Sequence, residues 1–110
     1  MKIGIAQLNH IVGDLEGNAA GILDAYRKLV ADGAELVVTP ELSLTGYPPR
    51  DLVFKSRFVP ETLAALERLH AEVEDVPLLV GYVDFHTDSV GKPFVNAAAL
   101  LQKGRALERV

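Results

Sequence analysis

One carboxylate stands in a distinctive setting near the middle of the chain. Glu41 follows the β-branched run at residues 37–39 and a proline, Pro40, and no other charged residue lies between Glu41 and Arg50. Because proline fixes φ and lacks an N–H, Pro40 is expected to end the strand that this run begins. Glu41 would then lie just beyond the carboxyl end of a strand, where ligands bind in open α/β sheets. Its carboxylate could serve as a general acid or base, or it could be a surface or ion-paired side chain.

The loop that follows Glu41 is expected to be stiff. Gly46, Pro48 and Pro49 restrict its backbone, and Tyr47 stands among them. Tyr47 could line a pocket beside Glu41, or it could pack on the two prolines. The sequence leaves both interpretations open.

Composition excludes several classes of function. The chain has 110 residues, of which 49% are hydrophobic and 24% charged, as is typical of one globular domain. A net charge of −4 gives no indication of nucleic acid or an anionic membrane as a partner, and no apolar run approaches the roughly 20 residues that span a bilayer. The chain has no cysteine, so it can supply neither a disulfide nor a thiolate, and the three histidines show no metal-ligand spacing. We expect a cytoplasmic protein without a metal site of its own.

The first half of the chain predicts a βαβ unit. Residues 2–8 form a continuous apolar strand pattern in which Ile3 and Ile5 are expected to be buried. A helix should begin at Asp14 or, one turn later, at Asn18, and end at Gly33. A second strand at 35–39 follows, so the two strands should be parallel, with a right-handed crossover.

The second half predicts a helix at 60–74 and strands at 78–83, 94–101 and 105–110. The strands at 78–83 and 94–101 are joined without a helix, which favours antiparallel pairing. The fold class is therefore α/β, a mixed sheet with both helices on one face. Since the strands are apolar on both faces and nothing remains to cover the second face, the chain is expected to be part of a larger domain.

Longer motifs indicate a family. Thr-Pro-Glu-Leu at 39–42 and Gly-Tyr-Pro-Pro-Arg-Asp-Leu at 46–52 resemble the nitrilase, or carbon–nitrogen hydrolase, superfamily, and more narrowly the amino-terminal glutaminase domain of bacterial glutamine-dependent NAD⁺ synthetases. The resemblance extends to Lys-Ile-Gly-Ile-Ala-Gln-Leu-Asn at 2–9, Val-Gly-Asp-Leu-Glu-Gly-Asn at 12–18, Gly-Ala-Glu-Leu-Val-Val at 33–38, Pro-Leu-Leu-Val-Gly at 77–81 and Asn-Ala-Ala-Ala-Leu-Leu at 96–101.

The resemblance implies the αββα nitrilase-like layered fold, with residues 1–110 as its amino-terminal portion. It also implies amide hydrolysis by a Glu–Lys–Cys triad, in which Glu41 is the catalytic acid–base and Tyr47 a candidate for binding L-glutamine. The lysine and the cysteine are expected beyond Val110, so these residues alone should be inactive. The ammonia would serve a carboxy-terminal synthetase domain that uses ATP and Mg²⁺, in an enzyme that resembles known homo-oligomers.

Two alternatives remain open from the sequence. The chain could come from a stand-alone amidase or carbamoyl hydrolase of the same superfamily. If the gene product truly ends at Val110, it could instead be a non-catalytic module.

Overall fold

The structure is a computed structural model that describes residues 1–8, 11, 14–40, 43–46, 58–85 and 94–110. In chain order its elements are β1 (Ile3–Ile5), α1 (Leu15–Ala31), β2 (Leu36–Val38), α3 (Phe58–Glu72), β3 (Leu78–Phe85), β4 (Phe94–Leu101) and β5 (Glu108–Arg109). Each strand and helix within these residues was predicted, with ends that differ by a few residues.

The strands form one mixed sheet in the order β1-β2-β3-β4-β5. β1, β2 and β3 are parallel, with Gly4 opposite Val37 and Val37 opposite Leu78. β4 is antiparallel to β3, as the missing crossover helix predicted, and β5 is antiparallel to β4. It follows that β1, β2, β3 and β5 all run in the same direction, so their carboxyl ends lie toward one edge of the sheet, which we call the carboxyl edge.

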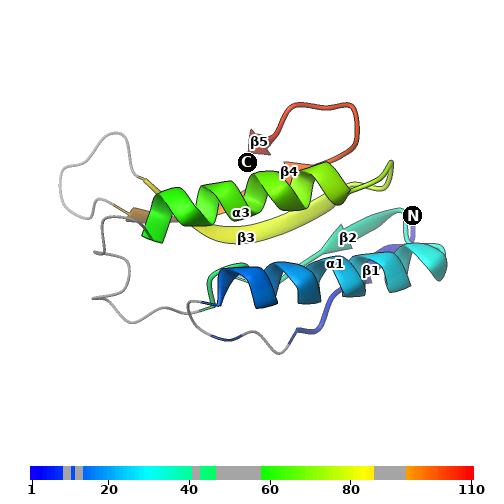
Figure 1. The fold of residues 1–110 in the computed structure, drawn as a ribbon. Coiled ribbons are helices and arrows are strands. Elements are labelled where there is room, and N and C mark those ends of the chain that lie inside the picture. The colour runs from blue at the N-terminus through cyan, green and yellow to red at the C-terminus, as the bar shows by residue number, and fades with distance from the viewer. Residues whose placement is uncertain (9–10, 12–13, 41–42, 47–57, 86–93) are drawn as a thin grey trace.

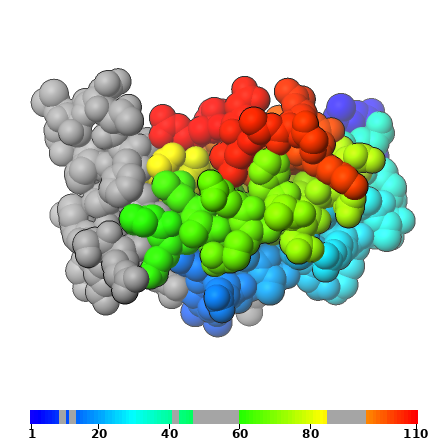
Figure 2. Space-filling model, turned by 45° about the horizontal axis from the view of Figure 1, so that its top comes forward, coloured from blue at the N-terminus to red at the C-terminus, as the bar shows by residue number. Residues whose placement is uncertain are grey.

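Both helices cover the same face of this sheet (Figure 1). They lie side by side (Figure 2), and α1 packs against β1 and β2 while α3 packs against β3. The largest buried hydrophobic side chains of this core are Tyr26, Tyr82, Ile22, Leu44, Leu66, Leu78, Leu101, Val37 and Val80. The predicted α/β architecture with helices on one face is therefore confirmed.

β1 faces the opposite way from the prediction. Ile3 and Ile5 are 53% and 70% exposed, whereas Gly4 and Ala6 face the helices and are buried. The reason is the close approach of α1: a Cβ added to Gly4 would lie 3.1 Å from the Cβ of Leu29. Only small residues fit on the helix side of β1, so its large residues lie on the second face, over which neither described helix packs.

The ends of α1 follow the predicted signals. The Asp14 side chain accepts a hydrogen bond from the Gly17 N–H at 3.1 Å and caps the helix, as expected of an aspartate at this position. Gly33, with a φ of 94°, follows the last turn. Asn18, the alternative cap, instead lies inside the helix, so that alternative was wrong.

In the second half of the chain the predicted elements are present, and the residues at which they begin or end differ from the prediction. α3 begins two residues before Pro60, which is tolerated because the first N–H groups of a helix have no intrahelical partner. β5 covers two residues instead of the six predicted at 105–110, because the chain is still turning through Gly104, whose φ is 80°.

We predict that the two faces of the sheet respond differently to truncation in this chain. Leu78→Ala should lower the free energy of unfolding by about 2–5 kcal/mol, because it leaves a cavity in the buried core. Ile5→Ala should cost less than about 1 kcal/mol, because the side chain is already largely in water. Urea denaturation followed by circular dichroism measures both. Equal losses would contradict the placement of Ile5 on an uncovered face.

Candidate active site

The residues predicted to do chemistry, Glu41 and Tyr47, lie outside the described residues. The structure does describe what stands on either side of Glu41, namely Thr39 and Pro40 before it and Ser43 after it. These residues follow β2 at the carboxyl edge, where the sequence placed the candidate site.

A hydroxyl network attaches both flanks of Glu41 to β3. Thr39 Oγ1 accepts hydrogen bonds from Ser43 Oγ at 2.6 Å and from the Gly81 N–H at 3.2 Å, and it donates to the Leu79 carbonyl at 3.1 Å. The Ser43 N–H also donates to the Pro40 carbonyl at 3.2 Å. Since Thr39 and Ser43 are both buried, these bonds are shielded from water. These bonds fix Thr39 and Ser43, which stand on either side of residues 40–42, the segment that contains Glu41.

Leu44 continues the attachment beyond Ser43. Its N–H donates to the Gly81 carbonyl at 3.1 Å, and its side chain is fully buried. Both backbone polar groups of Gly81 are therefore bonded to the segment around Glu41, one to Thr39 and one to Leu44. The sequence contained a signal for this frame, because the small hydroxyl residues Thr39 and Ser43 stand two positions before and two positions after Glu41.

Asn18 reaches the same segment from α1. Its Oδ1 accepts from the Ile11 N–H at 2.8 Å, and its Nδ2 donates to the Ile11 carbonyl at 2.8 Å and to the Leu44 carbonyl at 3.0 Å. Asn18 is only 5% exposed. It thus connects the segment that follows β1 with the segment that follows β2, a role that its position in the sequence did not reveal.

A hollow of about 390 Å³ adjoins Pro40 on the open face of the sheet. Its floor consists of small residues, Gly81 of β3 and Ala98 of β4, and Val110 lies on its wall. The Val110 N–H donates to the Ala98 carbonyl at 2.8 Å, so the chain still follows β4 at this point. Because β5 runs in the same direction as β2, a residue that follows Val110 would lie closer to the carboxyl edge.

Three polar side chains join β3 and β5 on the helix-covered side. The Tyr82 hydroxyl donates to Asp84 Oδ2 at 3.1 Å, and Arg109 lies 3.3 Å from the same oxygen. Tyr82 is 1% exposed. Burial, assisted by the negative charge of Asp84, raises the pKa of Tyr82 to about 12, so its hydroxyl stays protonated and serves as a donor. The sequence analysis missed this cluster, because it depends on the pairing of strands.

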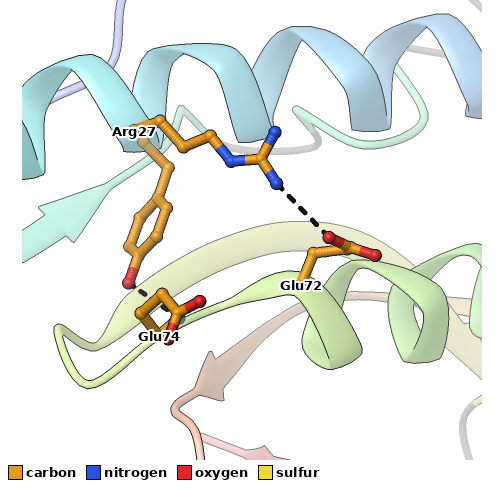
Figure 3. A network of polar contacts seen from close by, with 4 residues as sticks. Arg27, Glu72 and Glu74 are labelled. Carbon is orange, nitrogen blue, oxygen red and sulfur yellow. Dashed lines mark hydrogen bonds and ion pairs between the residues drawn. The ribbon is translucent and has the colours of Figure 1, made fainter.

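The opposite edge of the sheet is held by Tyr26 and an ion pair between the helices. The Tyr26 hydroxyl donates to the Val76 carbonyl at 2.7 Å and accepts from the Glu74 N–H at 3.1 Å. Next to it, Arg27 of α1 and Glu72 of α3 lie 3.3 Å apart (Figure 3). Burial raises the pKa of Tyr26 above its ordinary value. This cluster lies where β3 begins, far along α1 from Asn18.

Within the described part of the chain, no group of three or more His, Asp or Glu side chains could hold a metal ion. His70 is half-buried, with Nε2 3.2 Å from the Gln102 carbonyl, and His10 and His86 lie outside the described residues. No helix among the described residues is long and apolar enough to cross a membrane.

Comparison with known proteins extends over nearly the whole chain. The model of the carbon–nitrogen hydrolase family matches residues 2–109. A glutamine-dependent NAD(+) synthetase from Rhodobacter capsulatus is 41% identical over 108 residues, which are 98% of this chain and 19% of that protein. The chain therefore spans less than a fifth of the length of the curated relatives it matches.

Solved structures share the fold. A glutamine-dependent NAD(+) synthetase from Cytophaga hutchinsonii superposes with a TM-score of 0.81 at 25% identity, covering 93% of this chain and 17% of that one. An amidase from Nesterenkonia sp. superposes with a TM-score of 0.73 at 26% identity, covering 91% of this chain and 37% of that one. The family resemblance drawn from the motifs is confirmed.

We predict that the Thr39 hydroxyl stabilises the chain. Thr39→Val should lower the free energy of unfolding by about 1–3 kcal/mol, because the buried Gly81 N–H and the Ser43 hydroxyl lose their partner. Thr39→Ser keeps the hydroxyl and is the matched control, with a smaller expected loss. Urea denaturation of the two variants compares them. A larger loss for Thr39→Ser than for Thr39→Val would contradict the importance of this network.

We also predict a loss of stability at alkaline pH that depends on Tyr82. Between pH 10 and 12 the unfolded chain releases the Tyr82 proton while the folded chain keeps it, so the free energy of unfolding should fall as the pH rises. The expected contribution is about 3 kcal/mol, since each unit of pKa difference corresponds to about 1.4 kcal/mol. Urea denaturation as a function of pH tests this. Tyr82→Phe should flatten the decline, and an unchanged profile in that variant would refute the assignment.

Proposed function

The chain belongs to the carbon–nitrogen hydrolase family, and from this premise we propose that it forms the first part of the glutaminase domain of a glutamine-dependent NAD⁺ synthetase. The observation that carries the proposal is the similarity to such synthetases over 98% of the chain, including the motif around Glu41. The hydroxyl network at Thr39 supports it, because it holds both flanks of Glu41 at the carboxyl edge.

In this proposal Glu41 is the acid–base of glutamine hydrolysis. A cysteine thiolate from a later part of the chain attacks the carbon of the side-chain amide, and Glu41 gives a proton to the departing ammonia. Glu41 then takes a proton from the water that attacks the thioester, which releases glutamate and leaves the cysteine thiolate and the protonated Glu41 as they began. A lysine offers positive charge where the oxyanion develops. Tyr47, in the same loop as Glu41, would contact L-glutamine.

The direction of β5 supports the proposal that the catalytic lysine follows shortly after Val110. Val110 lies on the wall of the hollow beside Pro40, and its backbone still follows β4. In a longer chain, a residue shortly after Val110 would therefore extend toward the edge at which Glu41 follows β2.

The partners follow from the same proposal. The ammonia would pass to a carboxy-terminal synthetase domain, which uses ATP and Mg²⁺ to amidate nicotinic acid adenine dinucleotide. Neither ATP nor Mg²⁺ is assigned to residues of this chain. The parent enzyme is proposed to be a cytoplasmic homo-oligomer, and residues 1–110 are the portion of its glutaminase domain that precedes the catalytic lysine and cysteine.

A stand-alone amidase is the second candidate, since this chain also superposes on the Nesterenkonia amidase. The Gly-Tyr-Pro-Pro-Arg-Asp-Leu motif after Glu41 favours the synthetase instead. Reading the gene beyond Val110 separates the two, because a synthetase requires a second domain with an ATP site and an amidase does not. An open reading frame that stops at Val110 would leave a non-catalytic module.

We predict that Glu41→Gln in the full-length enzyme lowers glutamine-dependent NAD⁺ synthesis by about 10²–10⁴-fold, because the neutral amide cannot exchange protons. Synthesis from free ammonia should be almost unchanged, since ammonia bypasses amide hydrolysis. Steady-state rates with each nitrogen source provide the comparison. Equal loss with glutamine and ammonia would refute the role of Glu41 in hydrolysis.

A further inference from the structure

We propose that Asn18 is a positioning residue for Glu41, an inference that rests on the proposed glutaminase function. Asn18 projects from the amino-terminal part of α1 and bonds to the two segments that follow β1 and β2. In this view α1 does more than cover the sheet, because it sets the distance between those two segments at the carboxyl edge.

The three hydrogen bonds of Asn18, one accepted and two donated, match the side chain of an amide residue. Oδ1 faces a backbone N–H, and the two hydrogens of Nδ2 face two backbone carbonyls, of Ile11 and Leu44. Rotating the amide by 180° would set the NH₂ group against an N–H and the oxygen against both carbonyls, so the orientation is fixed by its partners. An aspartate would offer the same shape without the two donors, and an apolar side chain would offer none of the three bonds.

The bond to Leu44 is the one that reaches the site. Leu44 is three residues after Glu41, and its N–H is bonded to Gly81 of β3 while its carbonyl is bonded to Asn18. The chain after Glu41 is therefore held from the sheet on one side and from α1 on the other. On the side that precedes Glu41, the contacts are those of Thr39 and of the Pro40 carbonyl. Removing Asn18 takes away one bond on the side that follows Glu41 and leaves the bonds of Ser43 to Thr39 and of Leu44 to Gly81.

Tyr26 provides a matched comparison on the same helix. It too is a buried polar side chain of α1 that bonds backbone groups of a distant segment, Glu74 and Val76. Its contacts lie at the amino end of β3, away from Pro40 and Leu44. If Asn18 had only a structural role, substitutions at Asn18 and at Tyr26 should have similar effects on stability and on kcat.

The experiment uses the full-length enzyme with three variants: Asn18→Ala, Asn18→Asp and Tyr26→Phe. For each, we measure the melting temperature, kcat and KM for glutamine-dependent synthesis, and the rate with free ammonia. Asn18→Asp keeps the size and one acceptor of the side chain, so it serves where Asn18→Ala does not fold. The ammonia rate reports on the folded state of the whole enzyme.

If Asn18 positions Glu41, both Asn18 variants should lose about 100-fold in kcat with glutamine, since a displacement of about 1 Å costs that much, while KM and the ammonia rate change little. Tyr26→Phe should lower the melting temperature and keep its kcat. The proposal is overturned if Asn18 variants retain kcat with glutamine, or if Tyr26→Phe loses as much. An unmodified enzyme that makes no NAD⁺ from glutamine would instead refute the proposed function itself.

Discussion

The need of Gly81 for hydrogen-bond partners governs the structure at the end of β2. Gly81 lies in the middle of the sheet, where an unpaired backbone group would cost about 1–3 kcal/mol. On the side of β2 that faces β3, the Val37 N–H bonds the Pro77 carbonyl and the Thr39 N–H bonds the Leu79 carbonyl, so neither N–H reaches Gly81. The Thr39 hydroxyl takes the Gly81 N–H, and the Leu44 N–H takes the Gly81 carbonyl. The ladder is thus completed by two residues that lie on either side of Glu41.

This arrangement explains how a rigid sheet can carry a functional loop. Residues 40–42 are not needed to satisfy Gly81. The residues on either side of them are fixed, because Thr39, Ser43 and Leu44 are buried and bonded. Under the proposed function, such fixed flanks would hold the Glu41 side chain in a defined position, which acid–base catalysis requires.

Much of this could be predicted from the sequence, for identifiable reasons. The helices have clear apolar stripes and conventional ends at Asp14 and Gly33, and Pro40 marks the end of β2 with equal clarity. The orientation of β1 could not be predicted, because Ile3 and Gly4 are both compatible with a buried strand until the approach of Leu29 is known. The contacts of Asn18 and of the Tyr82, Asp84 and Arg109 cluster also escaped prediction. Each joins residues that are brought together only by the pairing of strands or by the packing of α1.

The position of α1 links these observations. At one end of the helix Tyr26 bonds the segment that leads into β3, and at the other end Asn18 bonds the segments that leave β1 and β2. Three residues beyond Tyr26, Leu29 lies so close to β1 that a Cβ added to Gly4 would be 3.1 Å from the Cβ of Leu29. The amino-terminal part of the helix, which carries Asn18, is the part that bonds the segment after Glu41. Under the proposed function, the Glu41 carboxylate would be positioned by residues well before it in the sequence, and its catalytic partners would come from later parts of the parent enzyme.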